Sequence, residues 1–372
     1  QSRRVWISGQ FLEAALKVED GKIVQIYPYG TVKADVDYGT KRIVPGFIDV
    51  HTHGAYGFDT NDAEKDGLRN WMKRIPEEGV TAILPTTVTQ MPDVLTAAVA
   101  NVAEVVREGY EGAEILGIHF EGPYLDMEYK GAQPPEAIAV PSVEQFQMYQ
   151  KAANGLIRYI TLAPEHDPEF ALTRYCKETG VVVSMGHSSA TYEQAMMGIA
   201  NGATSMTHVF NGMTPFHHRK PGPIGAGSER ENVVAELICD GQHIHPSAVR
   251  MAFKLFPGRI CLISDALRCC GMPDGQYTLG GQDVFLQNCV ARLADGTIAG
   301  SATNLYDCMR KAVEFGIPKE QAILSATSVP AKELGQEAEI GEISSGKLAD
   351  FVVCDEELNR KHVYLSGTQL DS

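Results

Sequence analysis

Eight short apolar segments, most of them separated by amphipathic stretches, limit the fold of this chain more than any other feature. The apolar segments are residues 47–50, 80–84, 115–120, 157–162, 181–185, 204–209, 233–239 and 260–263. The amphipathic stretches are residues 68–78, 94–108, 143–153, 170–179 and 192–201. Apolar strands that alternate with helices form a parallel sheet buried on both faces. We therefore predict an α/β protein whose residues 47–334 form a (β/α)8 TIM-like barrel.

Both ends of the chain have a different pattern, with short strand-like segments separated by turn signals. These segments are residues 5–7, 15–18 and 23–26 near the start, and residues 341–343, 350–353 and 362–365 near the end. Because the two ends resemble each other, we predict that they meet. The expected result is a small β-sandwich domain formed by both chain termini, from residues 1–46 and 335–372.

Composition limits the classes of partner that the protein is expected to bind and its expected cellular location. Lys and Arg total 32 against 47 Asp and Glu, so the 372 residues carry a net charge of −15. Such a surface repels nucleic acid and anionic membranes, and we predict neither as a partner. No apolar run approaches the ~18 residues of a membrane helix, and the first residues contain no signal-peptide core. The eight cysteines form no CxxC pair, which indicates free thiols and a cytoplasmic location.

Metal-ligating side chains follow the predicted strands, where the chemistry of a barrel of this kind is placed. They are His51, His53, Glu121, His187, His208, His243 and Asp265. His51 and His53 point to the same side of an extended chain, because strand side chains alternate. Imidazole and carboxylate ligands without thiolate suit Zn or Fe in a hydrolytic site. Asp265 can bind metal or accept a proton from water.

The segment after the sixth strand, residues 212–232, is rich in proline and glycine, so we predict a loop there in place of a helix. Asn211 and Arg219 are good oxyanion donors, and Gly212 allows a close approach of the backbone. These residues favour an anion pocket over the alternative, a mobile surface loop.

The motifs resemble the amidohydrolase superfamily, and within it the family of N-acetylglucosamine-6-phosphate deacetylases. The matching stretches are residues 45–54, 119–123, 130–132, 186–188, 207–213, 240–243, 264–266 and 348–352. The resemblance implies one divalent metal on Glu121, His187 and His208. Some members of the family carry a second metal on a histidine pair at the positions of His51 and His53, which others lack. This sequence keeps both histidines, so the resemblance allows one ion or two.

The resemblance also implies roles for the remaining site residues. Asp265 would be the catalytic acid and base, and His243 would contact the acetyl carbonyl. Sugar and phosphate contacts are implied for Ala132, Asn211, Gly212, Arg219, Ile298, Ala299 and Gly300. Members of the family are usually homodimers, and Arg219 is a candidate to serve the neighbouring subunit's site. Gln133 departs from the family, which often has His there.

The resemblance thus implies metal-dependent hydrolysis of the N-acetyl group of N-acetylglucosamine 6-phosphate, an amino-sugar phosphate. Zn or Fe is the favoured ion, and Mn or Co is also compatible with the ligands. Two alternatives stay open at this point: another amidohydrolase that acts on a cyclic amide or an aminopurine, and a metal-free sugar-phosphate-binding scaffold.

Overall fold

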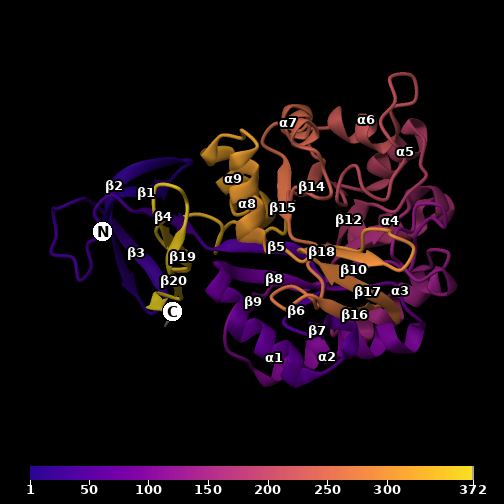
Figure 1. Cartoon of the computed structure of the whole chain (residues 1–372), viewed down its shortest axis with the longest axis horizontal. Coiled ribbons are helices and arrows are strands. Elements are labelled where there is room, and N and C mark those ends of the chain that lie inside the picture. The colour runs from indigo at the N-terminus through magenta and orange to yellow at the C-terminus, as the bar shows by residue number, and fades with distance from the viewer. Residues whose placement is uncertain (371–372) are drawn as a thin grey trace.

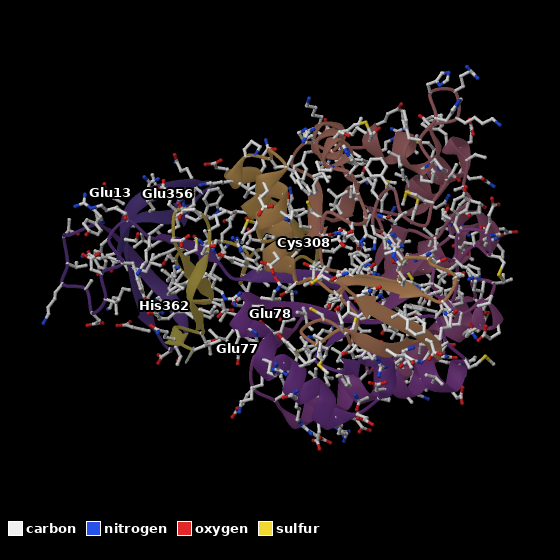
Figure 2. The ribbon with its side chains drawn as sticks, in the orientation of Figure 1. Glu13, Glu77, Glu78, Cys308, Glu356 and His362 are labelled. Carbon is white, nitrogen blue, oxygen red and sulfur yellow. The ribbon has the colours of Figure 1, made fainter. Side chains whose placement is uncertain are left out.

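A computed structural model describes residues 1–370 of the chain and confirms the predicted fold class. A barrel of parallel strands surrounded by helices forms the larger part, and a sheet made from both termini lies at one end of the molecule (Figure 1). Figure 2 places Glu13 and His362 on this terminal sheet and Glu356 in a turn beside it, whereas Cys308 lies in the adjoining wall of the barrel.

The barrel contains eight parallel strands in chain order, as the spacing of the apolar segments predicts. They are β5 (Phe47–Thr52), β8 (Val80–Thr87), β10 (Ile118–Glu121), β11 (Ile157–Leu162), β12 (Val182–Met185), β13 (Ser205–Met206), β14 (Val234–Ile238) and β15 (Ile260–Ile263). A short strand, β9 (Glu114–Ile115), pairs with β8 only. Nearly all strand residues are buried, because helices cover the outer face and side chains fill the interior.

Helices follow most of the strands. They are α1 (Lys65–Arg74), α2 (Pro92–Glu108), α3 (Val143–Ala152), α4 (Ala171–Glu178), α5 (Tyr192–Asn201), α6 (Gly222–Ser228), α7 (Pro246–Leu255), α8 (Leu305–Glu314), α9 (Lys319–Ser325) and α10 (Ser328–Glu333). Single 3-10 turns lie at Thr60–Asp62, Ile75–Glu78, Pro135–Ala137, Pro164–His166 and Pro168–Phe170. The side chains of Ser142, Thr191 and Asn304 accept the backbone N–H bonds that cap α3, α5 and α8.

The prediction that residues 212–232 contain no helix is wrong, since α6 lies within them. This helix is short and glycine-rich, and tertiary packing stabilises it against its low propensity. A Cβ at Gly227 would lie 2.2 Å from the sulfur of Met206, which shows how closely α6 packs on the barrel.

The terminal sheet has seven strands and confirms that the two ends of the chain meet. Its order is β21 (Thr368–Gln369), β20 (Arg360–Leu365), β19 (Phe351–Cys354), β4 (Arg42–Pro45), β1 (Ser2–Ile7), β2 (Gln10–Glu19) and β3 (Lys22–Pro28). The two termini join where β19 pairs antiparallel with β4. The predicted strand at 341–343 is wrong: Ile343 is buried under the sheet, but its backbone pairs with no strand within residues 1–370. The domain boundaries stay a prediction.

A small antiparallel sheet, which the sequence analysis did not predict, lies between β15 and α8 in the chain. Its strands are β16 (Gly275–Leu279), β17 (Gln282–Gln287) and β18 (Val290–Leu293), and a two-stranded ribbon, β6 (Gly54–Ala55) with β7 (Phe58–Asp59), follows β5. The amide of Gln282 donates to the carbonyl oxygen of Ala132 at 2.6 Å and ties this sheet to the loop after β10.

Two further observations concern the helices and the cysteines. Within residues 1–370, none of the helices combines the length and the apolar character that a membrane span requires. All eight cysteines are free, and only Cys289 among them is exposed.

The barrel closes where β15 meets β5, and the buried carboxyl group of Asp49 joins the two strands. The hydroxyl of Ser264 donates to Oδ2 of Asp49 at 2.6 Å, and the backbone N–H groups of Ser264 and His51 lie 3.3 Å from Oδ1. Burial raises the pKa of Asp49 to about 7, although these hydrogen bonds lower it.

This raised pKa predicts how stability depends on pH at the seam. The folded protein keeps the proton of Asp49 up to about pH 7, whereas the unfolded chain loses it near pH 4, so the group destabilises the fold as pH rises between these values. The amide introduced by Asp49→Asn has no such proton to lose. We expect the stability of Asp49→Asn relative to wild type to improve by roughly 1 kcal/mol per pH unit from pH 5 to 7 in chemical denaturation. A constant difference would contradict the raised pKa.

Candidate functional site

A cavity at the carboxyl ends of the barrel strands collects most of the predicted site residues. It is lined by His53, Glu121, Ala132, Gln133, His187, His208, Asn211, Gly212, His243, Asp265, Ile298 and Gly300, together with residues such as Leu279 of the small antiparallel sheet. His51 lies directly behind His53 and Glu121 and is fully buried. The strand ends therefore bring together side chains that lie up to 214 positions apart, from His51 to Asp265.

Glu121, His187 and His208 form the first group of converging donor atoms. Oε1 of Glu121 lies 3.2 Å from Nε2 of His187 and 3.3 Å from Nε2 of His208, and the two nitrogens are 3.1 Å apart. A tetrahedral ion about 2.0–2.1 Å from each ligand separates its ligands by about 3.3 Å. The three donors therefore already have the spacing that such an ion requires.

His51, His53 and Glu121 form a second group, which shares Glu121 with the first. Nε2 of His53 lies 3.3 Å from Oε2 of Glu121 and 3.1 Å from Oδ1 of Asp265. Nε2 of His51 lies 3.5 Å from Oε1 of Glu121 and has no hydrogen-bond partner among residues 1–370. A buried nitrogen with a free lone pair that faces carboxylates fits a site for a second cation.

The outer nitrogen of each ring determines which tautomer it adopts. Nδ1 faces the carbonyl oxygen of Thr86 in His53 (3.3 Å), of Tyr129 in His187 (2.8 Å) and of Asn211 in His208 (3.1 Å). Because a carbonyl oxygen only accepts, these Nδ1 atoms carry the protons and the Nε2 lone pairs point inward. Several lone pairs then face one another and Glu121, an arrangement that a bound cation stabilises.

Opposite charges that face one another determine the ionisation of these buried groups. Burial opposes a charge on His51, but Glu121, Glu236 and Asp265 outweigh it and raise its pKa well above the ordinary value. The pKa of His53 is likewise raised to about 9 by Asp265 and Glu121 against the effect of burial. Burial opposes the charge on the two carboxylates, but the imidazoles, His51 first, lower the pKa of Glu121 well below its usual range and that of Asp265 to about 2. The second protons of His51 and His53, on Nε2, thus occupy the electrostatic place of a cation, and an ion that binds to these nitrogens displaces them.

Three of the site residues have positive φ angles, which non-glycine residues rarely adopt: His187 (45°), His208 (28°) and Asp265 (51°). Two backbone hydrogen bonds hold Asp265 in this conformation. Its N–H donates to the carbonyl of His51 at 2.9 Å, and its carbonyl accepts from the N–H of Ser301 at 2.7 Å. Such strained residues concentrate at functional sites, where the surrounding fold stabilises them.

His243 enters the cavity from the loop after β14 and is held by Asp240. Nδ1 of His243 lies 2.8 Å from Oδ2 of Asp240, and both side chains are 8% exposed. Burial alone would lower the pKa of His243, but Asp240 outweighs it and raises the pKa. With Nδ1 engaged, Nε2 is the nitrogen left to contact a ligand.

Besides His51, two predicted site residues do not line the cavity. Ala299 is fully buried between Ile298 and Gly300, which do line it. Arg219 is exposed in the loop before α6, which projects from the barrel (Figure 1), and its guanidinium contacts His218 at 2.7 Å. Nothing within residues 1–370 of one chain brings this arginine to the cavity.

Two residues contact the donor groups in ways that sequence reasoning missed: Glu236 was not considered, and Gln133 was noted only as a departure from the family. Glu236 of β14 accepts from Nδ1 of His51 at 2.9 Å. The side-chain amide of Gln133 donates to Oε2 of Glu121 at 2.7 Å and accepts from the N–H of Thr89 at 2.8 Å, so it supports Glu121. Glu236 could have been found as a charged residue within an apolar strand, because a fully buried carboxylate requires a partner.

Known proteins resemble this chain over almost its entire length. The model of the Amidohydrolase family matches residues 42–370. N-acetylglucosamine-6-phosphate deacetylase of Bacillus subtilis (strain 168) is 40% identical over 349 residues, which cover 90% of this chain and 87% of that protein. N-acetylgalactosamine-6-phosphate deacetylase of Escherichia coli O157:H7 is 36% identical and covers 95% of this chain and 93% of its own length.

Solved structures agree with the sequence comparison. The structure of a mutant N-acetyl-D-glucosamine-6-phosphate deacetylase from Mycobacterium smegmatis, in complex with N-acetyl-D-glucosamine-6-phosphate, superposes with a TM-score of 0.93 at 33% identity. The match covers 99% of this chain and 97% of that one. Sequence, fold and site geometry lead to one conclusion: the chain belongs to the amidohydrolase family, and within it to the N-acetylglucosamine-6-phosphate deacetylases.

Proposed function

We propose that this chain hydrolyses the N-acetyl group of N-acetylglucosamine 6-phosphate and releases acetate and glucosamine 6-phosphate. One observation carries the proposal: a single cavity contains a cation-binding donor set, the ionised carboxylate of Asp265 and the carboxylate-held His243. The relatives support the substrate. They do not favour the alternatives of a cyclic amide, an aminopurine or a metal-free scaffold.

We assign the metal to the two groups of donor residues. Glu121, His187 and His208 would hold one ion, and His51 and His53 would hold a second together with Glu121. A divalent metal such as Zn or Fe, when bound, lowers the pKa of water and polarises a carbonyl group. Mn and Co suit the same nitrogen and oxygen ligands.

Asp265 is the proposed acid and base. Its low pKa keeps the carboxylate ionised at neutral pH, so it can accept a proton from the attacking water. It then transfers this proton to the amide nitrogen as the bond to the acetyl carbon breaks. The positive φ and the hydrogen bonds to β5 and Ser301 hold the carboxylate at the cavity wall.

His243 is the proposed donor to the acetyl carbonyl oxygen. Asp240 stabilises its protonated form, so Nε2–H can donate to the oxygen as negative charge develops there. A donor that is already oriented needs no rearrangement during the reaction, which makes its contribution larger.

The remaining cavity residues are proposed to bind the sugar and its phosphate. Ala132, Ile298 and Gly300 would contact the sugar, and Asn211 and Gly212 would contact the phosphate. Because Arg219 does not reach the cavity of its own chain, we propose a homodimer in which it serves the neighbouring site. We also propose a cytoplasmic location, which the free cysteines support.

A second candidate substrate is N-acetylgalactosamine 6-phosphate, because the Escherichia coli relative carries that name at 36% identity. The two sugars differ only in the configuration at C4. A direct comparison of turnover on both compounds decides between them.

Acetate release tests the proposed reaction. We expect chelator-sensitive turnover of N-acetylglucosamine 6-phosphate, restored by Zn²⁺, with a lower kcat/KM for N-acetylglucosamine and for the galactose epimer. Absence of acetate from metal-loaded protein would contradict the reaction. Turnover that is indifferent to the phosphate would contradict the substrate.

Asp265→Asn tests the acid–base role. The amide keeps the shape of the side chain but cannot accept a proton, so kcat should fall about 10²–10⁴-fold. Metal content, measured on the same sample, should remain that of wild type. Near-native turnover with metal bound would refute the assignment.

Arg219→Ala tests the phosphate contact. Removing the guanidinium should raise KM for the phosphorylated sugar and change KM little for N-acetylglucosamine, because only the former carries the dianion. Mixing inactive Asp265→Asn chains with Arg219→Ala chains distinguishes the two subunit arrangements. A contact across the dimer predicts mixed dimers with one fully intact site, whereas a contact within the chain predicts none.

A further inference from the structure

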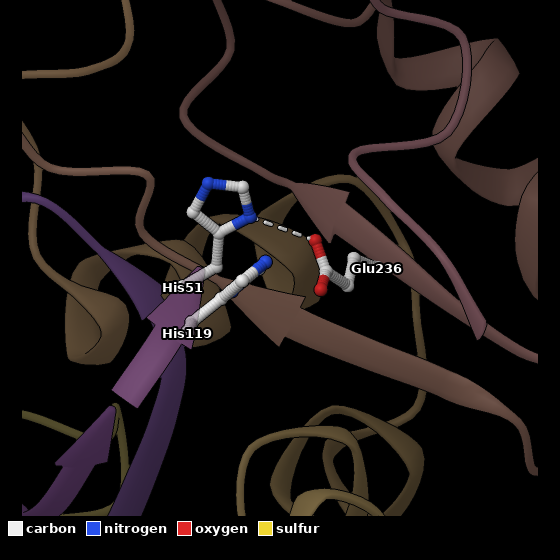
Figure 3. A group of neighbouring side chains, drawn as sticks. All are labelled: His51, His119 and Glu236. Atoms are coloured by element: carbon white, nitrogen blue, oxygen red, sulfur yellow. Dashed lines mark hydrogen bonds and ion pairs between the residues drawn. The ribbon is translucent and has the colours of Figure 1, made fainter. Parts of the chain in front are cut away.

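The four inward-pointing imidazoles are oriented by two different kinds of group. Backbone carbonyls orient His53, His187 and His208, whereas the carboxylate of Glu236 orients His51 (Figure 3). A carbonyl is sufficient to fix a tautomer. A carboxylate in the same place also raises the basicity of the ring and its strength as a ligand. His51 is therefore the imidazole whose metal binding depends most on a replaceable side chain.

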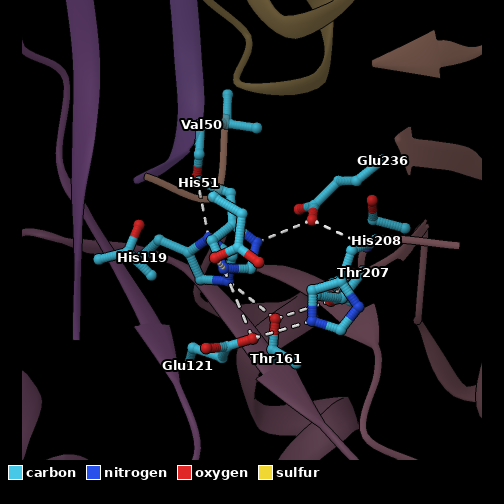
Figure 4. A network of polar contacts seen from close by, with 12 residues as sticks. Val50, His51, His119, Glu121, Thr161, Thr207, His208 and Glu236 are labelled. Atoms are coloured by element: carbon cyan, nitrogen blue, oxygen red, sulfur yellow. Dashed lines mark hydrogen bonds and ion pairs between the residues drawn. The ribbon is translucent and has the colours of Figure 1, made fainter. Parts of the chain in front are cut away.

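Glu236 lies on β14, is fully buried and is directed at His51 (Figures 3 and 4). Its Oε2 accepts from Nδ1 of His51 at 2.9 Å and lies 3.3 Å from the backbone N–H of His208. Its Oε1 has no hydrogen-bond partner among residues 1–370. A buried carboxylate with so few donors depends on the positive charge of its surroundings.

His119 packs against His51 but does not compete for Glu236. The two ring centroids are 4.4 Å apart. Nδ1 of His119 lies 2.8 Å from the carbonyl oxygen of Val50, and its Nε2 lies 2.8 Å from the hydroxyl of Thr161. With both nitrogens engaged, His119 supports the ring of His51 mechanically and leaves it as the partner of Glu236.

The charge balance shows what this carboxylate contributes. Glu121, Asp265 and Glu236 place three carboxylates in one buried region, and a single divalent ion offsets only two negative charges. The third charge attracts a further positive charge, and the inward Nε2 of His51 is where it would be bound. Glu236 thus acts on the ion of the His51–His53–Glu121 group rather than on that of Glu121, His187 and His208.

We propose that Glu236 is a positioning residue: it holds the proton of His51 on Nδ1, directs the Nε2 lone pair at the second cation and is required for retention of that cation. The inference rests on the metal site of the proposed function and is independent of the substrate. It explains why a carboxylate occupies an otherwise apolar strand.

Zinc binding to metal-free protein tests the proposal, with bound Zn²⁺ per chain measured against buffered free Zn²⁺. Wild type should bind two ions. Substitution of such a supporting group typically weakens metal binding about 10–100-fold. For the second ion we expect the Kd to rise about 10-fold in Glu236→Gln, which keeps an acceptor for Nδ1–H. In Glu236→Leu, which keeps none, we expect it to rise about 100-fold. The first ion should bind as in wild type.

Two controls separate positioning from a general structural effect. Glu333→Gln makes the same change at another buried carboxyl group, which contacts Tyr159 and none of the metal donors, and it should bind zinc as wild type does. In a His51→Ala background, adding Glu236→Gln should not change zinc binding further, because Glu236 acts through His51.

Three results would overturn the proposal: a single ion on wild type at saturating Zn²⁺, an unchanged second ion in Glu236→Gln, or an equal loss in Glu333→Gln. Glu236→Gln preserves the volume of the side chain and decides the question if Glu236→Leu fails to fold. No substrate enters the measurement, so its failure is distinguishable from a failure of the deacetylation assay.

Discussion

Electrostatic repulsion among converging acceptors is the constraint on which this site depends. Nε2 of His187 and Nε2 of His208 lie 3.1 Å apart, and both face Oε1 of Glu121. Burial removes the water that would otherwise screen these atoms. Positive charge must therefore be present, either as protons on His51 and His53 or as metal ions, and the catalytic cavity is built around that requirement.

Backbone groups, more than side chains, hold the site residues in the orientations that a bound cation requires. Carbonyl oxygens of Thr86, Tyr129 and Asn211 orient three of the rings. The positive φ angle of Asp265 is stabilised by its backbone hydrogen bonds to His51 of β5 and to Ser301. Preorganisation of this kind allows the site to stabilise charge without rearrangement during the reaction.

Much of this arrangement could be predicted from the sequence, because strand periodicity and histidine placement are local signals. The segments at 157–162 and 260–263 match β11 and β15, and the predicted ligands do converge. The segment at 204–209 contains only the two-residue β13, because the chain turns at His208 to present the ring. Sequence analysis missed Glu236 because its partner, His51, lies far away in the chain. It missed α6 because tertiary packing, not helix propensity, stabilises that helix. Arg219 depends on a proposed second subunit, which one chain does not contain.

Anomalous scattering at the zinc edge, from crystals grown with Zn²⁺, tests the central claim most directly. The account predicts one peak among Glu121, His187 and His208, about 2.0–2.1 Å from each nitrogen, and a second beside His51 and His53. Absence of a peak among Glu121, His187 and His208, or zinc bound only elsewhere, would contradict it.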